Sequence, residues 1–223
     1  MKYFLFIIVA VLSMSFVVNK TYTTNQLIGK SQVQLYGTHY KLQKEVYFAL
    51  EKMRKEAKKQ GIKIKVVSAY RGFEHQKKIW NRKYTKFISQ GYSSVKAIEK
   101  VKEYTAIPGT SRHHWGTDVD LTNGVSSLTN TKKGKFLNWM DENAHKFGFY
   151  RTYTKNKFRK GYNYESWHYS YRKIAKPMLT QYLKLDIVKI LSKQDIKGNT
   201  YFTNNYLSKY IENNVLGINT YLY

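Results

Sequence analysis

The sequence predicts an α+β domain in which helices flank a small, mostly antiparallel sheet. Three observations favour this class. Several segments carry apolar residues at three- to four-residue intervals, other short segments alternate polar and apolar residues, and the two kinds follow one another without a regular βαβ rhythm. The 223 residues, of which 42% are hydrophobic and 16% aromatic, suit one folded core.

The first half of the chain contains three predicted helices and one predicted strand. Apolar residues that share one face predict a first helix, ending at Gly61: Leu42, Val46, Leu50, Met53 and Ala57. Residues 62–66 then alternate isoleucine or valine with lysine, as a half-buried strand does. Residues 73–90 and 93–103 are compatible with two more helices, and a loop follows at Pro108.

Two further strands and one helix are predicted in the middle of the chain. Residues 117–121 alternate polar and apolar side chains, which puts Asp118 and Asp120 on one face of a strand. An amphipathic helix at residues 136–147 ends at the glycine that follows it. Residues 162–171 are again strand-like.

Residues 172–223 are predicted to be a helical extension of the domain. Helical patterns occur around residues 174–191 and 206–215, and Pro177 and Gly198 are expected to break them. No chemical motif is present in this part of the chain. We therefore interpret these helices as packing elements or as an appendage that faces outward.

The amino-terminal end predicts export. Residues 3–18 are almost continuously apolar and follow Lys2, which is typical of a secretory signal or a short membrane anchor at residues 1–19. The run is somewhat shorter than the roughly 20 residues that a spanning helix prefers, so cleaved signal and uncleaved anchor both stay open. Residues 20–37 are polar with scattered apolar residues and are interpreted as a linker or a loosely docked segment, so that the domain covers residues 38–223.

The composition restricts partners and chemistry. A formal net charge of +25 attracts polyanions, and candidates are nucleic acid, anionic lipid and anionic cell-wall polymer. No single basic cluster is typical of a nucleic-acid-binding element, so we expect no specific nucleic-acid partner. Because the chain has no cysteine, any metal must be bound by His, Asp or Glu.

One stretch concentrates those residue types. The segment SRHHWGTDVDL, residues 111–121, contains His113 and Asp120, which could supply two metal ligands on either side of a glycine turn. His168 in ESWHY is the third candidate, and Glu165, three residues earlier, is a carboxylate that could accept a proton from an activated water. The conjunction of the two motifs indicates a metallohydrolase.

These motifs resemble those of the zinc D-alanyl-D-alanine carboxypeptidases of the vancomycin-resistance type. That family belongs to a group that also contains lysostaphin-type peptidases and the hedgehog signalling domain, and its signature is SxHxxGxAxD followed by ExWH. The upstream segment SAYRGFEHQ, residues 68–76, is similar to the family's SGYRSxxxQ. The three motifs span residues 68–168, roughly the middle half of the chain, and imply the D,D-peptidase and hedgehog fold.

The resemblance implies a role for each motif residue. One zinc ion would be bound by His113, Asp120 and His168, and Glu165 would be the general base. Arg71 would stabilise the developing oxyanion or the substrate carboxylate. Gln76 of the SAYRGFEHQ segment and Ser111 of the SRHHWGTDVDL segment would hold the peptide terminus.

Two residues depart from this pattern or are left ambiguous by it. Asp118 stands where the family has alanine, and it could be a ligand, support a ligand or tune the affinity for the metal. Asp120 is preferred as the ligand because the family's spacing from His113 leads to it. His114 is expected to point away from the metal, because successive side chains of extended backbone diverge; contact with substrate is the alternative.

The implied activity is hydrolysis of the carboxy-terminal D-alanyl-D-alanine bond of peptidoglycan stem peptides. Alternatives on the same fold are an L,D-carboxypeptidase, a peptidoglycan endopeptidase and, in a different class, a non-catalytic wall-binding module that contains zinc. Export to the periplasm or cell-wall face, with residues 3–18 as a possible membrane anchor, would suit this substrate. The positive charge would hold the protein near an anionic wall polymer or lipid surface. Nothing in the sequence specifies an oligomeric state.

Overall fold

The computed structural model describes residues 20–124 and 130–223. The predicted signal or anchor at residues 1–19 lies outside the described residues. Among the helices that are described, none has both the length and the apolar character needed to cross a bilayer.

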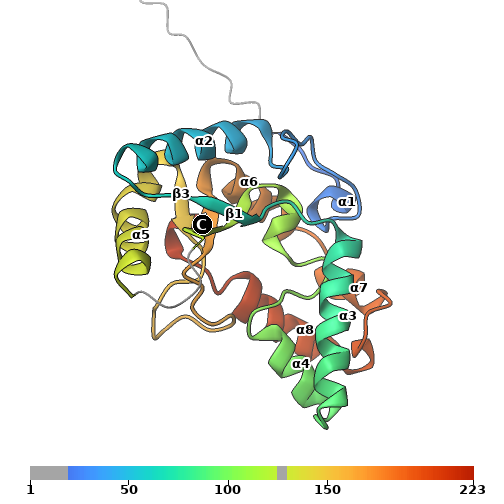
Figure 1. Cartoon of the computed structure of the whole chain (residues 1–223). Coiled ribbons are helices and arrows are strands. Elements are labelled where there is room, and N and C mark those ends of the chain that lie inside the picture. The colour runs from blue at the N-terminus through green and yellow to red at the C-terminus, as the bar shows by residue number, and fades with distance from the viewer. Residues whose placement is uncertain (1–19, 125–129) are drawn as a thin grey trace, which may run out of the picture.

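A four-stranded antiparallel sheet forms the centre of the fold, in the spatial order β1-β2-β4-β3 (Figure 1). Its strands are β1 (Lys65–Ser68), β2 (Asp118–Thr122), β3 (Phe149–Arg151) and β4 (His168–Tyr171). All three strand pairs are antiparallel. The predicted small antiparallel sheet within an α+β fold is therefore confirmed.

Helices surround the sheet, and a group of helices that includes α3, α4, α7 and α8 extends to one side of it (Figure 1). The α-helices are α1 (Thr24–Leu27), α2 (Lys44–Lys59), α3 (Phe73–Ser89), α4 (Ser94–Lys102), α5 (Asn130–Asn143), α6 (Arg172–Tyr182), α7 (Ile187–Ser192) and α8 (Asn204–Tyr210). Shorter 3-10 and π turns connect them: η1 (Arg112–Trp115), η2 (Ala144–Phe147), η3 (Asn199–Tyr201), η4 (Ile211–Val215) and η5 (Thr220–Leu222). The strands are therefore interspersed among the helices without a regular βαβ rhythm, as the sequence pattern indicates.

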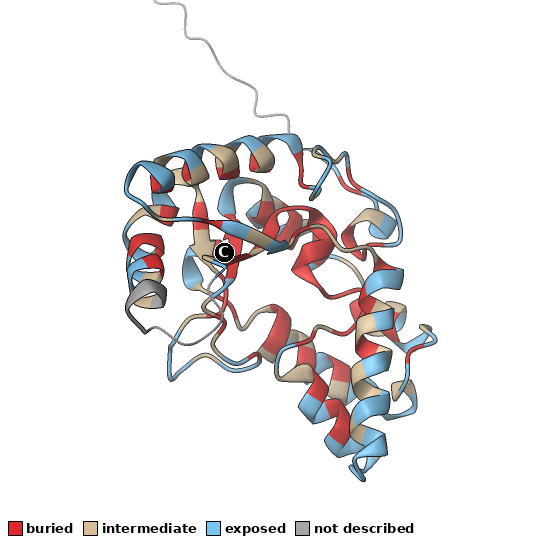
Figure 2. Ribbon diagram, viewed as in Figure 1, coloured by how far each residue is buried: buried red, intermediate tan, exposed pale blue. Residues whose placement is uncertain are grey.

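Two groups of buried side chains replace the single core expected from chain length. The sheet cluster joins α2, the sheet and α5, and includes Leu42, Val46, Leu50, Met53, Val119, Leu121, Trp139, Met140, Phe149 and Tyr169. The C-terminal cluster joins α1, α3 and α4 to the last helices, and includes Leu27, Trp80, Ile98, Trp115, Met178, Tyr182, Leu207, Tyr210 and Leu222. Figure 2 shows buried segments running through both parts, with exposed residues on the outer faces of α2, α3 and α4. Ile174 packs against both clusters and joins them.

The segment predicted to be a linker packs against the protein. Within residues 20–37, Thr23 caps α1 by accepting a hydrogen bond from the backbone of Gln26. Leu27 and Ile28 then lie in the C-terminal cluster, and Trp115 donates its indole N–H to the carbonyl of Leu27 at 3.0 Å. Too few apolar residues are present for the sequence pattern to show this packing in advance.

Helix α6 differs from its prediction in one respect. It continues through Pro177, which was expected to break it. Ala175, Met178 and Leu179 are buried on either side of the proline, so their packing stabilises a helix that has lost one backbone hydrogen bond.

Candidate metal centre

Strand β2 brings two aspartates to one face of the sheet. Val119 and Leu121 are buried in the sheet cluster, whereas Asp118 and Asp120 both contact His168 on the other face. Successive side chains of a strand point to opposite faces, and the sequence predicts this alternation. In the β2–β4 ladder, Asp120 is paired directly with His168.

The chain turns sharply before β2 and thereby places a histidine beside that face. After η1, Gly116 adopts the left-handed conformation with φ of 64°. The backbone conformation favours glycine, and a Cβ at this position would lie 2.8 Å from Leu35 Cδ2, so the end of the Leu35 side chain would have to shift. The turn leaves His113 Nε2 3.4 Å from Asp120 Oδ2.

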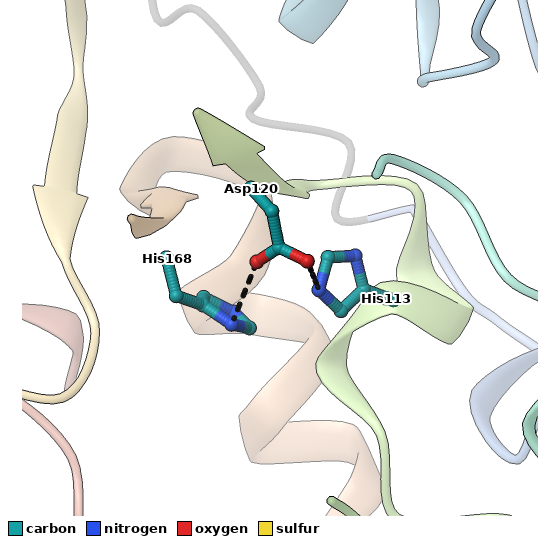
Figure 3. Close-up of side chains that lie close together, drawn as sticks. All are labelled: His113, Asp120 and His168. Carbon is teal, nitrogen blue, oxygen red and sulfur yellow. Dashed lines mark ion pairs between the residues drawn. The ribbon is translucent and has the colours of Figure 1, made fainter. Parts of the chain in front are cut away.

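His113, Asp120 and His168 converge on one point, as Figure 3 shows. One candidate ligand atom from each residue lies within 4.8 Å of the others. Asp120 stands between the rings: Oδ2 faces His113, and Oδ1 is 3.4 Å from His168 Nδ1. Two imidazoles and one carboxylate form a donor set typical of catalytic zinc sites. The adjoining cavity leaves the fourth coordination position accessible to water or substrate.

The hydrogen bonds of His113 prepare its free nitrogen for a metal. Its Nδ1 donates to the carbonyl of Ala69 at 2.7 Å, which fixes the tautomer and leaves the lone pair of Nε2 free. Both His113 Nε2 and Asp120 Oδ1 are buried without a hydrogen-bond partner. Burial and the charge of Arg71 lower the pKa of His113, so its ring is neutral, as a metal ligand must be. The residues therefore fit a bound zinc ion.

His168 is held by carboxylates at both ring nitrogens. Nε2 is 3.1 Å from Asp118 Oδ1, while Nδ1 faces Asp120 and lies 3.3 Å from Glu165 Oε2. Burial opposes the charged ring, but the hydrogen bonds to Asp118 and Glu165 and the charge of Asp120 raise the pKa of His168 to about 10. Asp118 holds Nε2, so the nitrogen available to a metal is Nδ1, and a bound cation would take the place of the proton that the raised pKa keeps on the ring.

Asp118 acts from behind His168 and does not belong to the converging group. Its carboxylate accepts hydrogen bonds from Arg112 Nε at 3.0 Å, Thr117 Oγ1 at 2.6 Å and Ser170 Oγ at 3.0 Å. Burial alone would raise the pKa of Asp118, but the charge of Arg112 and the bonds from His168 and Thr117 hold it well below its usual range. Of the three roles the sequence left open for Asp118, this geometry favours support of a ligand.

His114 points away from the converging group, as expected for the neighbour of His113. Its Nδ1 donates to the carbonyl of Arg71 at 2.6 Å, and its Nε2 accepts from the backbone N–H of Gly109 at 3.1 Å. The ring also lies against Gly29, where a Cβ would approach within 2.4 Å. Burial lowers the pKa of His114 to about 3, so the side chain is a neutral brace between three loops.

Glu165 reaches the cluster because it precedes the strand. Residues three apart on a regular strand face opposite sides, which would separate Glu165 from His168. The backbone instead makes a turn at residues 166–167, and β4 begins only at His168. Glu165 is buried, and its backbone N–H donates to the carbonyl of Tyr153 at 3.1 Å. This turn before β4 therefore brings Glu165 to the side of His168.

The other predicted residues line a cavity of about 260 Å³ beside the cluster. Arg71 Nη1 donates to Gln76 Oε1 at 2.9 Å, and Gln76 Nε2 donates to the carbonyl of Ala106 at 2.8 Å. Arg71 Nη2 is 3.8 Å from Asp120 Oδ2, and its Nε is buried without a partner. Ser111 also lines this cavity, so the structure brings all seven predicted site residues to one place.

The cavity has further lining residues that sequence reasoning did not select. Arg112 and Lys83 add positive charge, and Tyr104 and Trp167 form an exposed pair with ring centroids 6.2 Å apart. For Lys83 a signal was present, because Gln76 and Lys83 lie seven residues apart and so share one face of a helix. For Tyr104 no local signal existed, because the fold alone brings it beside Trp167.

Comparisons with known protein families agree with the motifs. The model of the VanY family, D-alanyl-D-alanine carboxypeptidase, matches residues 39–174. A D-alanyl-D-alanine carboxypeptidase of Enterococcus faecalis (strain ATCC 700802 / V583) is 36% identical over 117 residues, which make up 52% of this chain and 42% of that protein. The chain spans about half the length of the curated relatives it matches, or less.

Two solved structures share the fold. One is a zinc(II) complex of a mutant VanY, a vancomycin-resistance D,D-pentapeptidase from the VanB-type resistance cassette; its TM-score is 0.56 at 26% identity, over 77% of this chain and 90% of that chain. The other is VanYB in complex with D-alanine-D-alanine, with a TM-score of 0.56 at 26% identity over 74% of this chain and 92% of that chain. The D,D-peptidase-like fold implied by the motifs is thereby confirmed.

Proposed function

Since this chain belongs to the D-alanyl-D-alanine carboxypeptidase family, we propose that it is a zinc-dependent enzyme that removes the terminal D-alanine from peptidoglycan stem peptides. The observation that carries the proposal is the convergence of His113, Asp120 and His168, with Glu165 beside them, at the wall of one cavity. Relatives that carry zinc or D-alanine-D-alanine in their structures support the choice of metal and substrate.

In this proposal the residues of the chain divide the chemistry. His113, Asp120 and His168 would hold the zinc ion, which would supply Lewis acidity to the scissile carbonyl and the attacking water. Glu165 accepts a proton from the attacking water and later delivers it to the departing amine. Arg71, whose Nε has no hydrogen-bond partner among the described residues, donates hydrogen bonds to the negative charge that develops on the carbonyl oxygen.

Gln76 and Ser111 position the substrate in this scheme, Gln76 by orienting Arg71 and Ser111 by direct contact. Gln76 orients Arg71 through a 2.9 Å hydrogen bond and is itself fixed by the carbonyl of Ala106. Ser111 is buried at the cavity wall directly before η1, where its hydroxyl can bind the peptide terminus. Asp118 contributes by keeping His168 Nδ1 directed at the metal position.

The test is mass analysis of defined peptides incubated with the protein, with and without a chelator. We expect a pentapeptide that ends in D-alanyl-D-alanine to lose one D-alanine, and we expect the chelator to stop the reaction. Loss of D-alanine only from the tetrapeptide would instead identify an L,D-carboxypeptidase, and internal fragments an endopeptidase. Zinc-loaded protein that cleaves none of them would identify a non-catalytic wall-binding module.

We further propose that the protein acts at the outer face of the cytoplasmic membrane, held near anionic wall polymer or lipid. Export is a prediction from residues 3–18, and the net charge of +25 supports electrostatic retention. Retention on isolated walls should fall steeply between about 0.05 M and 0.5 M salt, because the Debye length shortens over that range. A sedimentation assay with walls measures this, and retention that is insensitive to salt would contradict the electrostatic part.

A further inference from the structure

Lys83 is a cation in the cavity that the proposed chemistry does not use. It lies on α3, on the same face as Gln76 and Ile79, and these three residues line the cavity together. Long side chains on a helix lean toward its amino terminus, which directs the ammonium group of Lys83 back toward Gln76 and Arg71. The charge of Lys83 therefore belongs to the substrate cavity rather than to the outer surface.

The ammonium group of Lys83 has one hydrogen bond and no anionic partner. Nζ donates to Thr105 Oγ1 at 2.6 Å, and Thr105 is buried. Among the described residues Lys83 forms no ion pair, whereas Lys77, on the same helix, pairs with Asp195 at 3.0 Å. Burial, followed by the charge of Arg71, lowers the pKa of Lys83. A half-buried ammonium group with two unused N–H donors is thus held in place by a hydroxyl alone.

Apart from Arg71, which the proposed chemistry uses, the other charges that line the cavity are already engaged. Arg112 is neutralised by Asp118 at 3.0 Å, and the carboxylates of Asp120 and Glu165 both face His168. Once a zinc ion binds, it adds positive charge beside these carboxylates. Lys83 is therefore the cation that is free to bind an anionic group of the substrate, and burying such a charge without a partner is unfavourable.

We propose that Lys83, positioned by Thr105, binds a carboxylate of the peptide substrate and leaves Arg71 to stabilise the oxyanion. The inference rests on the proposed function, because it assumes that a peptide enters this cavity. An ammonium group with two free donors binds a carboxylate well, and the hydroxyl hydrogen of Thr105 can donate to the same group. A stem peptide offers two sources: its carboxy terminus and the α-carboxylate of its D-glutamyl residue.

The experiment compares Lys83→Met with wild type on three synthetic pentapeptides. The first has both carboxylates free, the second has a carboxy-terminal amide, and the third has an amidated D-glutamyl carboxylate. Because a hydrogen bond to a charged group is lost, we expect kcat/KM of Lys83→Met to fall roughly 10- to 100-fold on the first peptide. If Lys83 binds the carboxylate that one of the two amidated peptides lacks, wild type and Lys83→Met should cleave that peptide at rates within about threefold of each other. That peptide then identifies the carboxylate that Lys83 binds.

Control variants separate this role from a structural one. Lys86→Met removes an exposed lysine from the same helix and should leave all three rates unchanged. Lys83→Arg keeps the charge and should recover part of the activity on the first peptide. Lys83→Gln serves in place of Lys83→Met if the latter shows a lower melting temperature. Zinc affinity, measured by competition with a chromophoric chelator, should equal that of wild type in every Lys83 variant.

Two outcomes would overturn the inference. Activity of Lys83→Met on the first peptide that equals wild type means that Lys83 binds no carboxylate. An equal loss on all three peptides means that Lys83 acts through the structure of the cavity. Wild-type protein that cleaves none of the peptides contradicts the proposed function instead; direct calorimetric binding of the first and second peptides to wild type and Lys83→Met then decides whether Lys83 discriminates a carboxylate.

Discussion

At the scale of single residues, the two aspartates of β2 differ in how many hydrogen bonds they already accept. Asp120 faces two histidines across distances of 3.4 Å that a metal ion can fill, whereas Asp118 is saturated by Arg112, Thr117 and Ser170. A carboxylate that already accepts three hydrogen bonds has little capacity left for a metal. Its remaining interaction, with the far nitrogen of the His168 ring, fixes the orientation of a ligand.

Replacing Asp118 by Asn should weaken zinc binding about 10- to 100-fold, because the side chain that holds the ligand His168 would no longer carry a negative charge. The same change leaves the buried guanidinium of Arg112 without a counter-ion, so the metal-free protein should lose about 3–5 kcal/mol of stability. Chelator competition measures the first effect and urea unfolding the second.

A double variant separates the two effects of that change. Arg112→Met combined with Asp118→Asn removes the unpaired charge and should recover much of the stability while zinc affinity stays low. Full recovery of zinc affinity in the double variant would show that Asp118 serves the fold alone.

Glu165 is the residue whose loss should stop turnover and spare the metal. Glu165→Gln keeps the shape of the side chain but cannot accept a proton, so kcat should fall by about 10²- to 10⁴-fold. Zinc content, measured by atomic absorption, should stay at the wild-type level, since the converging group does not include Glu165. Glu142→Gln, at an exposed position on α5, is the matched control. Turnover that is unaffected would remove Glu165 from the role of general base.

At the scale of elements, the site depends on how η1 joins β2. The left-handed Gly116 ends η1 two residues before β2 begins, and His113 and Asp120 meet although six residues separate them. The segment is also tied at its back, where Gln43 Nε2 donates to the carbonyl of Trp115 at 2.8 Å. Side chains of the metal cluster are therefore oriented by backbone that is fixed on both sides.

Substituting Gly116 by Ala tests this turn, and Gly61 supplies the matched control. Both glycines have positive φ, 64° and 72°, but a Cβ at Gly61 meets nothing within 4 Å, whereas at Gly116 it lies 2.8 Å from Leu35. Gly61→Ala should cost about 1–2 kcal/mol, the usual cost of the left-handed conformation. Gly116→Ala should cost about 2–4 kcal/mol and also lower zinc affinity. Equal losses in urea unfolding would mean that the contact with Leu35 is unimportant.

The elements that the sequence predicts well are those whose pattern is local. The helix at Leu42 to Ala57 and the alternation of β2 follow from periodicity. The bond from Arg112 to Asp118 and the approach of Lys83 to Thr105 do not. Each of those contacts depends on how separate elements pack against each other. No periodic pattern in the sequence encodes which polar side chains of two such elements meet.

At the scale of the whole molecule, the last helices are part of the site's support. Tyr210 of α8 lies in the C-terminal cluster, and its hydroxyl accepts a hydrogen bond from the backbone of Ile107 and contacts Thr110 Oγ1, both at 3.0 Å. Ile107 and Thr110 belong to the loop that leads into η1. Further along, the backbone N–H of Asn219 donates to the carbonyl of Thr152 at 2.8 Å, beside β3. Residues 172–223 thus connect to both ends of the cavity.

This connection predicts that the two buried clusters unfold together. Tyr210→Phe removes the hydroxyl and leaves the buried N–H of Ile107 unsatisfied, so the free energy of unfolding should fall by about 1–3 kcal/mol. The loss should appear as a single transition, with coincident midpoints by far-UV circular dichroism and by tryptophan fluorescence, because the loop before η1 couples the C-terminal cluster to β2. Tyr201→Phe, at an exposed tyrosine of η3, should leave the midpoint unchanged. Two separated transitions would mean that the C-terminal helices form an independent unit, and the metal centre would then keep its zinc affinity after the first of them.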